Sequence, residues 1–136
     1  MVTLKEEMEF LDAYLAIEQT RLGDRLKVLK EIDSKTLSVR VPAFILQPLV
    51  ENAIQHGISP IPQGGVVRIS SQLSDSWVYF QIEDDGVGMG EGNAAGRGVG
   101  LSNVAERLQR IFGPVSRLDI HSLPEKGTKV SFRIPE

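Results

Sequence analysis

The spacing of apolar residues along this chain changes from a helical period to a strand period and back, and this alternation limits the folds open to it. Apolar residues recur every three or four positions over residues 4–21, 42–57 and 99–112, which is the pattern of amphipathic helices. Segments between and after these helices suit β-strands. The expected strands cover residues 26–32, 39–41, 66–73, 76–83, 115–122 and 128–134.

The order of these elements predicts an α+β fold. The later strands come in hairpin pairs, and one of the helices separates the two pairs. Amphipathic helices between paired strands bury their apolar faces as one layer against a sheet. We therefore expect a two-layer α/β sandwich, in which helices cover one face of a single mixed sheet.

The first expected helix has sequence signals at both ends. Thr3 and Glu6 form a capping box, and Gly23 ends the helix. Because its polar face is strongly charged, the helix is either a packing helix beside the sheet or the tail of a longer helical region. We accordingly divide the chain into an N-terminal helix, residues 1–24, and a main domain, residues 25–136.

Prolines and glycines set the expected bounds of the later helices. Pro42 suits the first position of the second helix, and Gly57 suits its C-terminal stop. Pro48 should kink or restart this helix, because proline has no N–H to donate. The third helix is expected to begin at about Val99, directly after a glycine-rich stretch.

The composition excludes several classes of protein. A net charge of −3 gives no general attraction to nucleic acid or anionic lipid, so we expect no nucleic-acid partner and no direct membrane contact. The absence of cysteine excludes disulfides and thiolate metal sites. No apolar run approaches the length that spans a bilayer. A phosphate-bearing ligand would therefore need local geometry and a bound cation.

A polar stripe follows the apolar face of the second helix. Asn52 and His56 are one turn apart, as are Glu51 and Gln55. Such side chains suit a hydrated hard cation and phosphate oxygens, because Mg²⁺ prefers oxygen ligands and keeps several waters. Taken alone, the stripe is more typical of a solvated helix face.

Two glycine clusters lie between the strand expected over residues 76–83 and the third helix. Asp84 ends a strand and can accept a hydrogen bond from an exocyclic amino group such as that of adenine, while Gly86 and Gly88 allow a close backbone approach. The segment 96–101 leads into the helix expected at Val99, whose free N–H groups would bind an anion. The alternatives are an acidic turn and a flexible linker. Neither cluster has the dinucleotide or P-loop signature.

Four motifs in order resemble those of the sensor histidine kinases, which belong to the GHKL superfamily of ATP-binding domains. Residues 49–57 resemble the N box, 84–88 the G1 box and 96–101 the G2 box, and Gly127-Thr128 is similar to the last motif. The wording of residues 2–24 and 100–108 is most similar to the LytS-type kinases. The usual F box is not visible.

The resemblance implies roles for individual residues. Asn52 matches the asparagine that coordinates Mg²⁺, His56 a position near the phosphates, and Asp84 the aspartate that holds the adenine amino group. Glu51, beside Asn52, would act through water, so Asn52, His56 and Glu51 form the expected catalytic group. Residues 90–96 would be the ATP lid. The other expected nucleotide-binding residues are Gly86, Gly88, Arg97, Gly98, Val99, Gly100, Leu101 and Thr128.

The implied function is that of an ATP–Mg²⁺-binding catalytic domain, which transfers the γ-phosphate to a histidine in an upstream domain absent from this chain. His56 and His121 are not expected to be phosphoacceptors. The implied partners are that upstream domain and, through it, a response regulator. The implied whole protein is a homodimer anchored in the membrane, with this domain in the cytoplasm. The isolated domain is expected to have little kinase activity.

Three alternatives remain open at this point. A gyrase- or Hsp90-like ATP hydrolase uses a carboxylate one turn before the metal-binding asparagine, where this chain has Pro48. A freestanding serine kinase of the anti-sigma type shares the same fold. A nucleotide-sensing module without catalysis is the third alternative.

Overall fold

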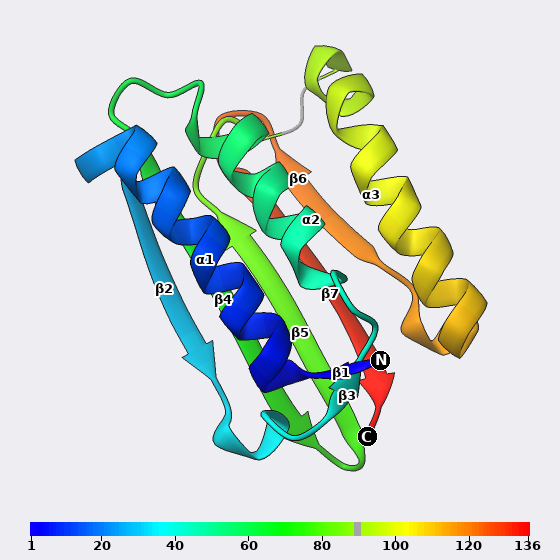
Figure 1. Ribbon diagram of the computed structural model, residues 1–136. Helices are drawn as coiled ribbons and strands as arrows, with labels where there is room; N and C mark the ends of the chain where they lie inside the picture. Colours follow the sequence, from blue (N-terminus) through cyan, green and yellow to red (C-terminus); the bar gives the residue numbers. More distant parts are fainter. Residues whose placement is uncertain (89–90) are drawn as a thin grey trace.

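A computed structural model of the chain has the expected two layers, with the long helices on one face of a sheet (Figure 1). It describes residues 1–88 and 91–136, with the backbone alone for residues 91–99. Helix α2 packs between α1 and α3 (Figure 1). The helices are α1 (Leu4–Leu22), α2 (Leu46–Asn52), which continues as a π-helical segment over Ala53–Ile58, and α3 (Glu91–Phe112).

The described strands form a mixed sheet in the order β2-β4-β5-β7-β6. Strand β2 pairs with β4 in parallel, and the other neighbours are antiparallel. The α+β sandwich with one mixed sheet is therefore confirmed. The strands are β2 (Leu26–Ile32), β4 (Gly65–Ser74), β5 (Trp77–Asp84), β6 (Asp119–Leu123) and β7 (Gly127–Pro135), and a separate pair joins β1 (Val2–Thr3) to β3 (Arg40–Val41).

The core lies between the helical layer and the inner face of the sheet. Alternate residues of β4 and β5 point inward because side chains of a strand alternate between its faces. The rings of Phe80 and Phe132 stack there with centroids 5.0 Å apart. Fully buried side chains from both layers meet at this level, among them Leu11, Leu49, Ile54, Ile69, Phe80 and Leu108.

Both ends of α1 agree with the sequence prediction. The Oγ1 of Thr3 accepts a hydrogen bond from the N–H of Glu6, and the Glu6 carboxylate accepts one from the N–H of Thr3, each at 3.2 Å. Gly23 caps the other end with a φ of +61°. These contacts are local in sequence, which explains why the sequence alone predicts them.

The expected bounds of α2 were wrong at both ends. The helix begins at Leu46 and not at Pro42, because Phe44 between them has a φ of +57°, which an α-helix cannot include. Pro48 lies in the first turn, where its missing N–H would have no partner in the helix, so it causes no restart. Gly57 does not end the helical stretch, which continues to Ile58.

Two other boundaries also differ from those expected. Helix α3 begins at Glu91 and not at Val99. Once its later turns are docked, each residue added upstream gains one backbone hydrogen bond, which favours extension. Strand β6 begins at Asp119 and not at residue 115, because Pro114–Ser116 form a 3₁₀ turn. Within the described parts of the chain, no helix has the length and apolar character needed to cross a membrane.

Candidate functional site

The carboxylate expected to bind adenine is buried at the end of β5. Asp84 is only 4% exposed, and it lies opposite Thr128 of β7, which is 3% exposed. One carboxylate oxygen of Asp84 accepts a hydrogen bond from the N–H of Gly86 at 2.9 Å. This bond fixes the direction of the carboxylate and closes the turn that leaves the sheet.

Asp84 lies directly against the helical stretch that carries Glu51, Asn52 and His56. A Cβ added to Gly57 would stand 2.5 Å from the Asp84 Oδ1, which is closer than real Cβ atoms come. A Cβ on Gly86 would collide with the backbone carbonyl of Gly57. The N–H of Val87 donates to that same carbonyl at 3.1 Å. The two glycines therefore allow the helix and the loop after β5 to touch through their backbones.

The turn between β6 and β7 forms another wall beside Asp84. Ser122 and Thr128 share a hydrogen bond of 2.9 Å between their hydroxyl groups. The N–H of Glu125 donates to the carbonyl of Val87 at 2.6 Å. Gly88 has a φ of +72°, and a Cβ there would collide with the carbonyl of Leu123. The loop after β5 is thus packed against this turn as well as against the helix.

The expected metal ligand faces α3. A Cβ added to Gly100 would lie 3.8 Å from the Nδ2 of Asn52, so the two residues are neighbours across the junction of α2 and α3. Asn52 and Gly57 lie on one continuous helical stretch. The structure therefore brings Asp84 to Gly57, near the C-terminal end of this stretch, and Gly100 to Asn52, in its middle.

Three other expected site residues, Glu51, His56 and Leu101, differ in burial and in hydrogen bonding. The carboxylate of Glu51 accepts a hydrogen bond from the side chain of Gln47 at 3.1 Å, a partner one turn earlier that the sequence analysis did not identify. His56 is half-buried and immediately precedes Gly57. Leu101 is 4% exposed and belongs to the core.

Some of the expected residues lie outside the described side chains. These are Arg97, Gly98 and Val99, together with the whole segment 90–96 that was expected to form the lid. The backbone of α3 runs through residue 99 without a break, so the helix N-terminus expected at Val99 is not found. The expected helix start is therefore wrong, whereas the expected binding of phosphate by residues 96–101 stays a prediction.

The sequence analysis missed the structural roles of two residues. Gly57 contacts Asp84, whereas its position after an apolar run indicated only a helix stop. Asp85 accepts a hydrogen bond from the N–H of Val66 at 2.7 Å and thereby ties the loop to the start of β4. The adjacent pair Asp84-Asp85 was visible in the sequence, but which carboxylate points inward depends on the strand register.

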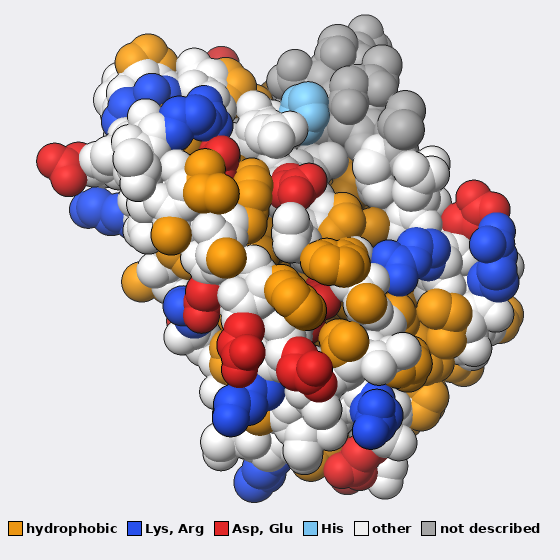
Figure 2. Space-filling model, in the orientation of Figure 1, with side chains coloured by type: hydrophobic (Ala, Val, Ile, Leu, Met, Phe, Trp, Pro, Cys, Tyr) orange, Lys and Arg blue, Asp and Glu red, His pale blue; other side chains and the backbone are white. Residues whose placement is uncertain are grey.

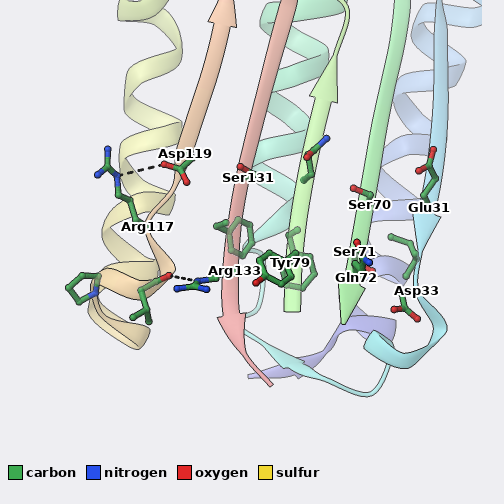
Figure 3. A pocket seen from close by; sticks show the side chains of 16 residues that line it. Glu31, Asp33, Ser70, Ser71, Gln72, Tyr79, Arg117, Asp119, Ser131 and Arg133 are labelled. Atoms are coloured by element: carbon green, nitrogen blue, oxygen red, sulfur yellow. Dashed lines mark hydrogen bonds and ion pairs between the residues drawn. The ribbon is translucent and has the colours of Figure 1, made fainter. Parts of the chain in front are cut away.

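A hollow of about 930 Å³ lies elsewhere, on the sheet face that the helices leave open (Figure 3). Its lining is polar and comes from all five strands of the sheet or their ends, with Glu31, Ser70, Tyr79, Ser131 and Arg133 pointing into view (Figure 3). None of the expected nucleotide-binding residues lines it. Its size alone does not make it the functional site, because the described motif residues converge on the opposite face.

An α/β sandwich with a buried aspartate at a strand end, held against a helix that carries an asparagine, is the arrangement expected of an ATP-binding domain of this sandwich type. The sequence profile of the family described as histidine kinase-, DNA gyrase B- and HSP90-like ATPase matches residues 39–136. The chain belongs to this family, and ATP binding follows from that membership.

Known relatives agree with this assignment. The sensor histidine kinase YesM of Bacillus subtilis is 37% identical over 139 residues, covering 99% of this chain and 24% of that protein. The sensor protein LytS of the same organism is 33% identical over 146 residues, covering 99% of this chain and 25% of that protein. The expected similarity to LytS-type kinases is confirmed, and the chain spans about a quarter of the length of these relatives.

A solved structure also agrees in fold. The histidine kinase domain of a blue-light activated kinase from Erythrobacter litoralis superposes with a TM-score of 0.69 at 21% identity, covering 99% of this chain and 62% of that one. At this level of identity the likeness concerns the fold alone.

Proposed function

We propose that this chain is the catalytic domain of a two-component sensor histidine kinase, and that it binds ATP with adenine at Asp84 and Mg²⁺-bound phosphates at Asn52. The observation that carries this proposal is the contact of Asp84 with Gly57 on the helical stretch that also presents Asn52 to Gly100. The two ends of one ligand can then be bound along one helix.

The surroundings of Asp84 suit an adenine amino group. A carboxylate can accept about four hydrogen bonds, so the bond from the Gly86 N–H leaves capacity for another donor. Burial at 4% exposure strengthens such a bond and removes competition from water. Thr128, opposite Asp84, adds a hydroxyl on the same side of the pocket.

The surroundings of Asn52 suit a hydrated Mg²⁺ bound to phosphate. The side-chain amide supplies a neutral oxygen, and Gly100 leaves space beside it because it has no side chain. Mg²⁺ is usually held by a few protein oxygens, waters and the phosphates themselves. Once bound, the ion would neutralise charge on the phosphates during phosphoryl transfer. Glu51 and His56, within a turn of Asn52, would contact the ion's waters and the phosphates.

The chemical step that fits this site is transfer of the γ-phosphate to a histidine in an upstream domain of the whole protein. That protein would be a membrane-anchored homodimer that passes the phosphoryl group to a response regulator, as a sensor kinase does. Water activation is disfavoured, because Pro48, one turn before Asn52, has no acid–base group. We therefore expect slow ATP hydrolysis.

Calorimetric titration with a non-hydrolysable ATP analogue tests this proposal. We expect binding that is at least about tenfold tighter with Mg²⁺ than with a chelator, because the ion joins Asn52 to the phosphates. Asn52→Ala should abolish that difference and keep the weaker, Mg²⁺-independent binding. An unchanged Mg²⁺ dependence in Asn52→Ala would show that Asn52 is not the ligand, and no binding by the parent chain would exclude the proposed function.

A further inference from the structure

Two charged side chains from different helices hold the segment that leads into α2. Glu7 of α1 is 1% exposed, and its two carboxylate oxygens accept the N–H groups of Phe44 at 2.8 Å and Leu46 at 3.0 Å. Arg107 of α3 donates to the carbonyls of Phe44 at 3.0 Å and Ala43 at 2.7 Å. We call Glu7 and Arg107 together the α1–α3 clamp.

The clamped segment has a backbone that needs such support. Phe44 has a φ of +57°, a conformation that bulky residues rarely adopt and that persists only where the surroundings hold it. Its side chain packs on Phe10 of α1, with ring centroids 5.4 Å apart. Both rings remain about half exposed. Hydrophobic side chains are spread over the helical face of the molecule (Figure 2). Helix α1 therefore holds Phe44 by its backbone and by its ring.

Helix α1 is joined to the preceding residues as well. The N–H groups of Leu4 and Lys5, in the first turn of α1, donate to the carbonyls of Val39 at 2.8 Å and Leu37 at 3.0 Å. Such N–H groups have no partner inside their own helix. Helix α1 and the segment from residue 37 to residue 46 are thus connected by hydrogen bonds at both ends of that segment.

The clamp is connected to the proposed nucleotide site through α2 and α3. Arg107 lies about two turns along α3 from Gly100, which faces Asn52. Asn52 is the last residue of α2, whose start the clamp fixes. A short helix moves nearly as a rigid rod, so a displacement at its start shifts Asn52 relative to Gly100.

We propose, on the basis of the nucleotide site described above, that Glu7 and Arg107 are positioning residues for the Mg²⁺–phosphate end of that site. They set the start of α2 against α1 and α3 and so fix the separation of Asn52 and Gly100. A change in the orientation of α1 alters phosphate binding through Glu7. Adenine binding at Asp84 depends on the other end of the helical stretch and is affected less.

The first test compares two arginines of α3. Arg107→Met keeps the aliphatic part of the side chain and removes both donors. Arg110→Met is the matched control, because Arg110 is 72% exposed and pairs with Glu106 on its own helix. With the ATP analogue and Mg²⁺, we expect Arg107→Met to bind about tenfold more weakly and Arg110→Met to bind like the parent. Arg107→Lys should recover part of the affinity, because its ammonium group can still donate to one of the two carbonyls.

The readout that separates positioning from stability is the gain in affinity that Mg²⁺ produces. If the clamp positions Asn52, this gain falls in Arg107→Met, while the affinity measured with a chelator changes little. Glu7→Gln should lower the same gain, because an amide oxygen replaces only one of the two acceptors. Since both residues act on one segment, the double variant should lose less than the sum of the single losses.

The possible results lead to different conclusions. If Arg107→Met and Glu7→Gln lower only the midpoint of urea unfolding and keep the parent's Mg²⁺ gain, the clamp is structural and the inference is wrong. If Arg107→Met does not fold, the same decision rests on Arg107→Lys and Glu7→Gln. Failure of the parent to bind the analogue removes the proposed function and this inference together, whereas binding by a parent with unaffected variants removes the inference alone.

Discussion

At the scale of single residues, the candidate site depends on glycines as much as on polar side chains. Asp84 reaches the helical stretch only because Gly57 has no Cβ, and Gly86 fits against Gly57 for the same reason. The buried carboxylate then has a fixed direction, set by its bond from Gly86. A specific polar contact with a base requires such a fixed acceptor.

Gly57→Ala tests this contact. The added methyl group would stand 2.5 Å from the Asp84 Oδ1, so either the carboxylate or the helix must move, and we expect a loss of about 1–3 kcal/mol in unfolding free energy. Gly100→Ala is the matched control, because its Cβ would be 3.8 Å from Asn52 and it lies inside α3. That change should stabilise the free chain by about 0.5–1 kcal/mol. Urea unfolding of both variants measures the difference, and equal effects would contradict the contact.

Asp84→Asn tests the adenine assignment. The amide group presents donors where the proposed ligand also presents a donor, so the affinity for the ATP analogue should fall at least about tenfold. Asp85→Asn serves as the control, because Asp85 is the neighbouring carboxylate and bonds only to the backbone of Val66 in the described contacts. Calorimetry decides the question: if Asp84→Asn binds as tightly as the parent, adenine is not held there.

At the scale of secondary structure, the elements were predicted well where their signals are local. The capping box of Thr3 and Glu6 is three residues long and fixes the start of α1 by itself. The start of α2 depends instead on Glu7, which is 39 residues before Leu46 in the sequence. No local pattern contains that contact, so Pro42 was given a position that the structure assigns to Leu46.

The candidate site shows the same division between motif and contact. Asn52 and Asp84 were predicted as binding residues from their motifs, and the structure places Asn52 on the helical stretch that Asp84 contacts. The contact of Gly57 with Asp84 was not identified, because it depends on how the end of β5 meets the helix. The position of Gly100 inside a longer α3 was not identified either, since the glycines around it indicated a helix start.

The turn after β2 gives an element-scale prediction about pH. Asp33 accepts hydrogen bonds from the N–H groups of Leu73 at 3.1 Å and Lys35 at 3.0 Å. These bonds, with that to Leu73 first, lower the pKa of Asp33 from its ordinary value of 3.8. A lowered pKa in the folded state means that Asp33 contributes stability above its ordinary pKa, and that this contribution is lost as pH falls through the lowered value.

Asp33→Asn should therefore destabilise the chain at pH 7, and the difference from the parent should shrink at pH 3. Asparagine keeps one acceptor oxygen and loses the other, so one of the two backbone bonds disappears. Asp12→Asn is a suitable control, because Asp12 forms an exposed pair with Lys30 and such pairs contribute little. Urea unfolding at both pH values measures the effect, and a difference that does not depend on pH would contradict the assigned pKa shift.

At the scale of the whole molecule, the proposed site is divided between the sheet and the helical layer. Strands β4, β5 and β7 form the centre of the sheet and hold Asp84 and Thr128 opposite each other. Asn52, Gly100 and the α1–α3 clamp all belong to the helices. The adenine end of the proposed site is therefore fixed to the sheet, and the phosphate end depends on how α1, α2 and α3 pack together.

This division predicts how ligands should stabilise the chain. At a free ligand concentration of about 100 times its dissociation constant, a ligand that binds only the folded state adds about 2.7 kcal/mol, which should raise the melting temperature by roughly 8 °C. The ATP analogue with Mg²⁺ should give this shift. With a chelator, or in Asn52→Ala, the same analogue concentration should give a smaller one, because only the sheet-bound end contributes. A thermal unfolding series measures all of these shifts together. Equal shifts with Mg²⁺ and with chelator would mean that Mg²⁺ does not join the phosphates to Asn52, which would contradict the proposed metal site.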